Sequence, residues 1–299
     1  MKVIRDAEEM RRWSRGQLAA RRSIGLVPTM GALHAGHTSL VDASVAADDV
    51  TVVSIFVNPA QFAPHEDYET YPRDFDEDCA KVETLGGMLI YAPTAESMYS
   101  KDYATYVEVE RLQEGLCGGA RPHFFRGVAT VVAKLFNTVL PDRAYFGEKD
   151  GQQAAIIRRM VRDLEFGVEI VTMPTVREAD GLAMSSRNAY LSPGERERAL
   201  SISRALLEAR ETLEAGERKA ERILAPVRKA LSGLEIDYIT LVDADELTAV
   251  ARVEGRVMLA VAAQIGKTRL IDNIQFDAGK KKESVSNPSK TLRVDPAER

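Results

Sequence analysis

The stretch that decides the fold is residues 23–37, which read SIGLVPTMGALHAGH. It opens with an apolar run, ending at Val27, that is typical of a buried strand. A loop with two glycines, Gly31 and Gly36, follows, and an apolar helical pattern begins at Leu40. A strand that passes through a glycine-bearing loop into a helix is the repeating unit of a parallel, helix-covered sheet.

Four more strand-like segments extend this unit, at residues 50–57, 88–92, 143–146 and 168–172. Helical patterns alternate with them, and the clearest, residues 128–140, repeats apolar side chains at every third or fourth position before Pro141 stops it. We therefore predict an α/β fold over residues 1–175, with a doubly wound parallel sheet. Such sheets bind ligands beyond the carboxyl ends of their strands.

The pattern changes after about Val176. A polar loop comes first, then helical patterns at residues 193–215 and 218–231 and extended segments at 236–242 and 256–262. This order predicts a second, smaller α+β domain over residues 176–277. Residues 278–299 carry a run of three lysines and almost no apolar residues, which predicts a tail without fixed structure in preference to a nucleic-acid-binding segment.

Composition narrows the functional class. The chain has a formal net charge of -5 and a pI near 5.6, so it offers no overall attraction to nucleic acid or an anionic membrane. Its two cysteines, Cys79 and Cys117, lack the spacing of a disulfide framework or a zinc site. Neither a signal peptide nor a run of about 18 apolar residues occurs. We expect a cytoplasmic protein with no nucleic-acid or membrane partner.

The glycine-bearing loop is the first candidate site. A helix start presents unpaired N–H groups to an anion, and glycine lets a ligand approach the backbone closely. His34 and His37 are three residues apart, so in a first helical turn they share a face and can donate to phosphate oxygens. The alternative is that one of them only caps the helix. The strand-to-helix context favours phosphate binding.

Three further segments carry polar side chains near predicted strand ends. Asn58 and Gln61 follow the second strand and suit a polar, uncharged pocket for a small hydroxylated acid. Lys149 and Gln153 follow the fourth strand, where the lysine can pair with a phosphate. Arg187 ends a Met-Ser-Ser-Arg loop and can bind two pyrophosphate oxygens at once.

Five segments, taken in order, resemble the motif series of the pantothenate synthetase family: PTMGALHAGH (28–37), SIFVNPAQF (54–62), YPRDFDED (71–78), FGEKDGQQ (146–153) and DGLAMSSRNAYL (180–191). The similarity runs to about Phe276. It implies a Rossmann-like nucleotidyltransferase domain, a small C-terminal lid domain and a homodimer. It also implies an ATP-dependent ligase that joins pantoate to β-alanine through a pantoyl adenylate, releasing AMP and pyrophosphate, with magnesium.

The resemblance also implies a set of site residues. Catalytic roles fall on His34, His37, Lys149 and Arg187. ATP would contact Met30, Gly31, Ala32, Leu33, His34, Ala35, Gly36, His37, Gly147, Glu148, Lys149, Asp150, Val176, Met184, Ser185, Ser186 and Arg187. Pantoate would contact Gln61 and Gln153, helped by Asn58. Glu77 or Asp78 matches the position of the magnesium contact.

One segment departs from the family pattern, which commonly reads R-P-G-H-F-R-G-V. Here His123 replaces the glycine and Phe124 replaces the histidine. Two other functions remain open. A plain nucleotidyltransferase would use the same histidine loop, although a phosphorylated substrate would require cations where the amides lie. A non-catalytic nucleotide-binding module would not release pyrophosphate.

Overall fold

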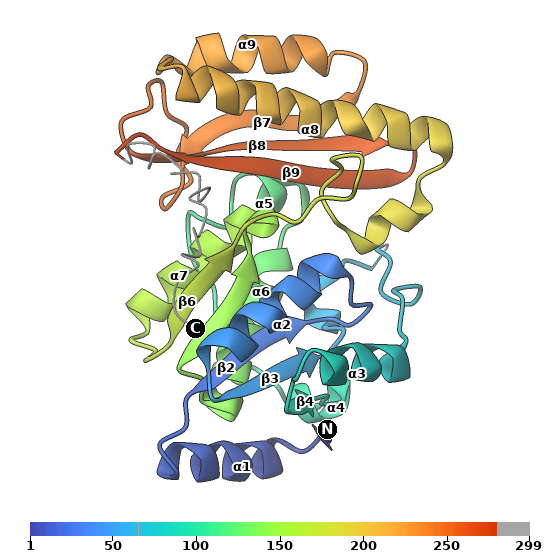
Figure 1. The fold of residues 1–299 in the computed structure, drawn as a ribbon, viewed down its shortest axis with the longest axis vertical. Coiled ribbons are helices and arrows are strands. Elements are labelled where there is room, and N and C mark those ends of the chain that lie inside the picture. The colour runs from blue at the N-terminus through green and yellow to red at the C-terminus, as the bar shows by residue number, and fades with distance from the viewer. Residues whose placement is uncertain (65, 280–299) are drawn as a thin grey trace, which may run out of the picture.

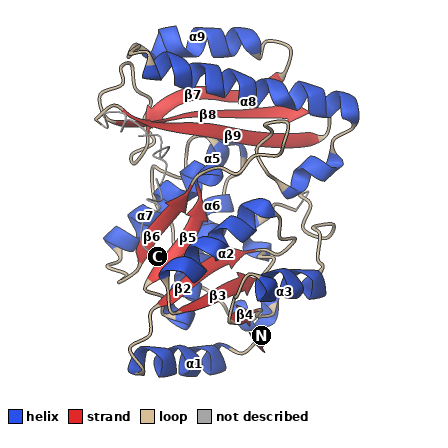
Figure 2. Ribbon diagram, viewed as in Figure 1, coloured by secondary structure: helices blue, strands red, loops and turns tan. Residues whose placement is uncertain are grey.

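The computed structural model describes residues 1–64 and 66–279, so residues 280–299 of the predicted tail lie outside it. Figure 1 shows two parts, an N-terminal part (residues 1–175) and a C-terminal part (residues 176–277), stacked along the long axis. Strands run through the middle of each part and helices cover them (Figure 2). No helix among the described residues is long and apolar enough to span a membrane.

The N-terminal part is built on a six-stranded sheet in the order β1-β4-β3-β2-β5-β6, with every pair parallel. Its strands are β1 (Lys2–Ile4), β2 (Ile24–Thr29), β3 (Val50–Ile55), β4 (Leu89–Tyr91), β5 (Arg143–Gly147) and β6 (Glu169–Met173). Its helices are α1 (Ala7–Ala19), α2 (Ala35–Ala47), α3 (Phe75–Thr84), α4 (Ala95–Met98), α5 (Cys117–Ala120), α6 (Phe124–Val139) and α7 (Gly151–Asp163), with 3-10 turns η1 (Pro59–Gln61) and η2 (Glu148–Asp150). The predicted doubly wound parallel sheet is confirmed.

The strand order reverses between β2 and β5, which is where such a sheet opens a crevice. The two strands pair only over Gly25 and Leu26, so they diverge toward their carboxyl ends. Pro28 lies in this divergent stretch. The Thr29 carbonyl bonds to the Phe56 amide on the β3 side, so Pro28 faces β5, where a missing N–H costs no ladder bond. The sequence thereby leaves an opening in the middle of the sheet.

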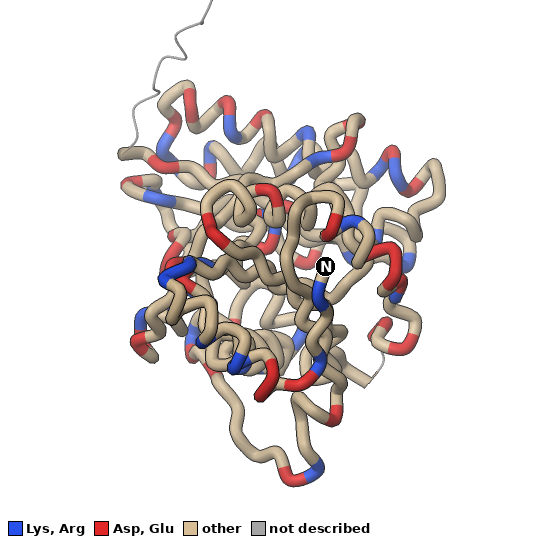
Figure 3. The backbone as a smooth tube through the Cα atoms, turned by 60° about the horizontal axis from the view of Figure 1, so that its bottom comes forward, with Lys and Arg blue, Asp and Glu red and all other residues tan. Residues whose placement is uncertain are grey.

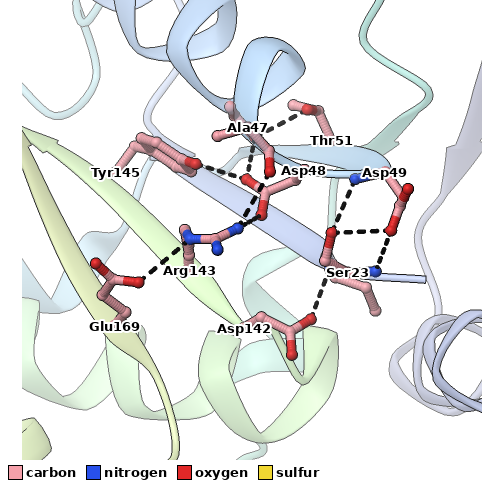
Figure 4. Close-up of polar contacts among 11 residues, drawn as sticks. Ser23, Ala47, Asp48, Asp49, Thr51, Asp142, Arg143, Tyr145 and Glu169 are labelled. Carbon is pink, nitrogen blue, oxygen red and sulfur yellow. Dashed lines mark hydrogen bonds and ion pairs between the residues drawn. The ribbon is translucent and has the colours of Figure 1, made fainter. Parts of the chain in front are cut away.

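The amino ends of the same strands are tied together by polar contacts (Figure 4). The Asp48 carboxylate has no exposed surface and accepts from Arg143 Nη1 at 2.6 Å and from the Tyr145 hydroxyl at 2.6 Å. Gly25 makes room for this group, since a Cβ there would lie 2.3 Å from Asp48 Oδ2. Arg143 also pairs with Glu169 on β6. Two strands that part at one end are therefore held at the other.

The C-terminal part is a three-stranded antiparallel sheet of β7 (Glu235–Asp243), β8 (Arg256–Ile265) and β9 (Thr268–Asp277). Helices α8 (Pro193–Glu214) and α9 (Ala220–Ala230) cover one face, and the turn η3 (Ser186–Tyr190) precedes them. The helices and strands share a core of their own, which includes Leu206, Leu213 and Val261. The other face looks toward the N-terminal part in Figure 1.

Two strands were missed by the sequence patterns. β1 has three residues, and only Ile4 is buried, so it carries no periodic signal. β9 alternates Leu270, Asp272 and Ile274 on one face, and the charged residue in the middle hides the apolar repeat. Figure 3 shows acidic and basic residues interspersed along the chain, so charge does not mark one part from the other.

Candidate active site

A cavity of about 1090 Å³ lies between the carboxyl ends of β2, β5 and β6 and the β9 side of the C-terminal part. Most of the predicted site residues line it, although they come from five separate segments. These are Met30, His34, Gly36, His37, Gln61, Gly147, Lys149, Asp150, Gln153, Val176, Met184, Ser185, Ser186 and Arg187. Gly31, Ala32, Leu33, Ala35, Glu148, Asn58, Glu77 and Asp78 do not belong to this lining.

His34 and His37 form a capping box at the start of α2. His34 is the N-cap residue, and its Nδ1 accepts from the Gly36 amide at 3.1 Å. His37 Nδ1 accepts from the His34 amide at 3.4 Å. The rings stack with centroids 4.1 Å apart. Capping and phosphate binding, which the sequence presented as alternatives, are compatible because each ring spends Nδ1 on the backbone and keeps Nε2 for a ligand.

Both imidazoles are held neutral in the ligand-free protein. Burial lowers the pKa of His37 to about 3, and His34 and Lys149 beside it act in the same direction. Burial and Lys149 also lower the pKa of His34. One edge of each ring is open to the cavity, so water relieves part of this desolvation, but the direction is the same for both. With Nδ1 accepting, a neutral ring carries its proton on Nε2 and donates it without adding charge.

The loop before the histidines is fixed by Asp78 on α3. Its two carboxylate oxygens accept from the Ala32 amide at 2.9 Å and the Leu33 amide at 2.7 Å. Gly31 adopts a φ of +85°, and a Cβ there would lie 2.9 Å from Asp78 Oδ2. Burial raises the pKa of Asp78 although the two amides draw it down. Gly31 is thus required by the turn and by the carboxylate packed against it.

This geometry corrects the expectation that Glu77 or Asp78 holds magnesium. Asp78 is 2% exposed and both its oxygens are engaged by backbone amides. Glu77 points outward and pairs with Lys81 at 2.8 Å. Both residues, with Ala32 and Leu33, line a separate cavity of about 470 Å³ behind the loop. Among the described residues, no group of three or more His, Cys, Asp or Glu side chains could hold a metal ion.

Gln61 reaches the cavity from η1 with Asn58 behind it. Its Nε2 contacts Met30 Sδ at 3.1 Å, and its Oε1 accepts from Asn58 Nδ2 at 3.2 Å. Asn58 is 1% exposed, and it also donates to the Gly127 carbonyl and accepts from the Tyr99 hydroxyl. The structure therefore places Asn58 as a support that orients Gln61, not as a group that faces a ligand.

The segment that departs from the family pattern forms one wall of the cavity. His123 adopts a left-handed φ of 74° at the position where the pattern has glycine. The Phe124 ring lies 3.8 Å from the Arg121 guanidinium, a cation–π contact. Arg121 makes a two-pronged ion pair with Glu66 and donates to the Gln61 carbonyl at 3.1 Å. Phe124 thus packs on an arginine that holds the Gln61 backbone, a link the motif comparison missed.

Lys149 enters the cavity from η2, which directly follows β5. Its ammonium lies 3.5 Å from Asp150 Oδ1, and its side chain is 20% exposed. Gly147 precedes it on the strand end, and Glu148 contributes its carbonyl to the loop's contacts. The lysine is therefore held at the rim of the sheet opening, where only one weakly placed carboxylate competes for it.

Adjacent glutamines on α7 have different surroundings. Gln153 lines the cavity. Gln152 is 6% exposed and is spent on the backbone, donating to the carbonyls of Leu112 and Gly115 at 2.9 and 2.8 Å and accepting from the Cys117 amide. The sequence alone does not distinguish the two. Only Gln153 is free to meet a ligand.

The polar loop after β6 closes the cavity from the C-terminal side. The Met184 amide donates to the Val176 carbonyl at 2.9 Å, which brings the two ends of the loop together. Ser185 caps η3, and Arg187 Nη2 donates to Asp67 Oδ1 at 3.2 Å. Ser186 hydrogen-bonds Tyr71, a contact that the motif series did not signal. Arg187 can leave its carboxylate partner for a more highly charged anion.

Two neutral imidazoles, a lysine and an arginine surround one cavity at the switch point of a parallel sheet. This arrangement defines a class, the α/β enzymes that bind a nucleotide's phosphates at a helix start. The family model for pantoate-beta-alanine ligase matches residues 2–275. The chain belongs to the pantoate-beta-alanine ligase family.

Individual relatives agree with this membership. The chain is 51% identical over 276 residues to pantothenate synthetase from Thermosipho africanus, covering 92% of this chain and 99% of the relative. The crystal structure of pantothenate synthetase from Thermus thermophilus aligns with a TM-score of 0.85 at 45% identity, covering 92% and 99%. Pantoate-beta-alanine ligase from Francisella tularensis, complexed with beta-gamma ATP and beta-alanine, aligns with a TM-score of 0.74 at 32% identity, covering 92% and 97%.

Proposed function

We propose that this enzyme condenses (R)-pantoate with β-alanine in two steps within the one cavity. The pantoate carboxylate attacks the α-phosphorus of ATP, forming pantoyl adenylate and releasing pyrophosphate. The β-alanine amine then attacks the acyl carbon and displaces AMP, giving pantothenate and a proton. Family membership supports the reaction. The observation that carries it to this site is the pair of free Nε2 donors at the α2 start, opposite Lys149 and Arg187.

The first step builds negative charge on the leaving phosphates, so groups that donate there lower its barrier. His34 and His37 would offer preorganised N–H donors, and Lys149 and Arg187 would supply positive charge. Ser185, Ser186 and the backbone at Met30 and Gly36 would complete the ATP contacts, with Val176 and Met184 beside the adenosine. No protein nucleophile is needed.

The acid substrate would lie at the amide end of the cavity. Gln61 and Gln153 would each pair with the hydroxyls and carboxylate of pantoate, and Asn58 would keep Gln61 in its orientation. Two amides recognise a neutral hydroxyl without attracting a second phosphate. This placement favours a ligase over a nucleotidyltransferase that acts on a phosphorylated substrate, because that substrate would require cations in place of the amides.

Magnesium belongs to the proposal only as a companion of ATP. The protein offers no preformed cage of carboxylates among the described residues, and Asp78 is already engaged. Mg²⁺ is commonly held by substrate phosphates and water with one or two carboxylates. We propose that the ion arrives with the triphosphate and neutralises its charge there.

We also propose that residues 1–175 and 176–277 are separate domains, with the second acting as a lid, and that the enzyme is a cytoplasmic homodimer, as the family resemblance implies. The separate cores of the two parts support the division. Sedimentation of the purified chain would measure its mass in solution, and a monomer at all concentrations would contradict the assembly.

The experiment that tests the function measures pyrophosphate release from ATP and magnesium with pantoate, with and without β-alanine, identifying the products by mass. Pyrophosphate that requires pantoate, with pantothenate and AMP only when β-alanine is present, is the expected result. His37→Ala should slow the single-turnover formation of the adenylate while leaving the fold intact. If pantoate has no effect on pyrophosphate release, the substrate assignment is wrong.

A further inference from the structure

β9 contacts two segments of the cavity wall through neighbouring residues. Successive residues of a strand point to opposite faces, so Asp272 and Asn273 face different surroundings. Asp272 shares a face with Leu270 and Ile274 of the C-terminal core, whereas Asn273 shares a face with Ile271, which packs on the N-terminal core. Both are buried, at 5% and 6% exposure. We call this pair the β9 pair.

Asn273 holds the η2 loop. Its Nδ2 donates to the Glu148 carbonyl at 2.9 Å and to the Lys149 carbonyl at 2.8 Å. Its Oδ1 is buried and has no partner among the described residues. An unpaired buried acceptor costs about 1–3 kcal/mol, so the amide is kept in this orientation by what its nitrogen does. The backbone that carries the Lys149 side chain is therefore fixed from the other part of the chain.

The fit around Asn273 leaves no room for slippage. Gly151 starts α7 directly after the η2 loop, and a Cβ on it would lie 2.4 Å from Met258 Sδ and 3.4 Å from the Asn273 amide. Met258 lies on β8 and is 2% exposed. A glycine is thus needed where α7 meets the C-terminal sheet, and the contact is one of close packing as well as hydrogen bonding.

Asp272 holds the other loop. Its carboxylate accepts from Arg177 Nη1 at 2.7 Å and Nη2 at 3.1 Å, a two-pronged pair. Arg177 Nη1 also donates to the Gly181 carbonyl, and Arg177 forms an antiparallel bridge with Ala183. The loop from Val176 to Met184 is thus folded against β9 at the base of the segment that leads to Arg187.

We propose that Asp272 and Asn273 are positioning residues that set the two phosphate-binding loops in register with each other. The inference rests on the proposed function, because it assigns the η2 loop to Lys149 and the second loop to Arg187. Neither residue of the pair needs to touch a substrate. Their effect is to make the placement of Lys149 and of the 176–187 segment a single event, because one rigid strand bonds to both.

The proposal predicts a specific pattern of mutant kinetics. Asn273→Leu removes the two donations and should lower the rate of adenylate formation by about 10- to 100-fold, since a displacement near 1 Å costs that much in a preorganised site. The KM for pantoate should change little. Gln275→Leu, two residues along on the same face of β9, is the matched control and should stay within about twofold of wild type. Asn273→Ala serves as the second variant if the leucine is not accommodated.

A double-mutant cycle separates positioning from general damage. If Asn273 acts through Lys149, then Asn273→Leu should have almost no further effect in a Lys149→Ala background. Multiplicative losses in the double variant would overturn the role. Amide hydrogen exchange needs no substrate and tests the coupling. Asn273→Leu and Asp272→Asn should each speed exchange in both 148–151 and 177–183, and loosening of only the nearer loop would contradict a single event.

The outcomes distinguish this inference from the proposed function. Wild-type enzyme that fails to release pyrophosphate with pantoate would refute the substrate assignment. The exchange experiment would still decide whether the β9 pair holds both loops.

Discussion

Asp78→Ala is the substitution that best tests how the phosphate loop is built. The change strips the Ala32 and Leu33 amides of their acceptor at 2.9 and 2.7 Å. Hydrogen bonds to a charged group contribute about 1.5–3 kcal/mol each, and release of the buried carboxylate offsets part of the loss. We expect a net cost of about 2–4 kcal/mol. The loop that carries His34 should loosen with it.

Two measurements follow from that figure. Thermal unfolding of the N-terminal part should move down by about 5–12 °C, at roughly 2–4 °C per kcal/mol for a unit of this size. The KM for ATP should rise at least about tenfold, which corresponds to 1.4 kcal/mol. Glu77→Ala is the matched control. Its side chain is 58% exposed and pairs only with Lys81, a contact worth about 0.3–0.5 kcal/mol.

The opposite result would refute the reasoning. If Asp78→Ala keeps the melting temperature and the KM for ATP but raises the magnesium concentration needed for half-maximal activity, then Asp78 is a metal ligand and not a loop support. A matching shift in Glu77→Ala would strengthen that conclusion.

Three further predictions concern other parts of the molecule. Because the pKa of His37 falls to about 3 on folding, the unfolded state binds more protons below pH 6.5. Stability should therefore be fully present above pH 6.5 and decline by up to about 1 kcal/mol per unit toward pH 3; urea titrations of His37→Gln should lose this slope, and an unchanged slope would exclude His37 as its source. Gly25→Ala should destabilise by about 2 kcal/mol or more, since its Cβ would lie 2.3 Å from Asp48 Oδ2, and wild-type urea stability would show that the strand can shift. Phe124→Leu removes the ring that lies 3.8 Å from Arg121 and should raise the KM for pantoate about two- to tenfold, whereas an unaltered KM would mean that the stack does not support Gln61.

Local signals made much of this architecture predictable. The strand–loop–helix unit at residues 23–37 gave the sheet class, and the spacing of His34 and His37 placed both rings on one face. Such features depend on periodicity and helix geometry, which are properties of a short segment. The expected ends of the elements differ from the observed ones by a few residues, as at β3, which stops at Ile55 instead of Val57.

The supporting residues could not be found in the same way, because their partners are distant in sequence. Asp78 bonds to an amide 46 residues before it, and Asn273 bonds to a carbonyl 124 residues before it. A carboxylate beside two other acidic residues looks like a metal ligand until its oxygens are seen to be occupied. Asn273 was further hidden because β9 itself was not predicted.

The buried Asp48 at the amino ends of β2 and β5 has a consequence for how variants of this enzyme would be measured. The group lies at the opposite end of the strands from the cavity and touches none of its lining. Losing it should therefore reduce the fraction of molecules that fold and leave each folded molecule as fast as before. Activity per milligram of total protein would fall, while activity per titrated active site would not.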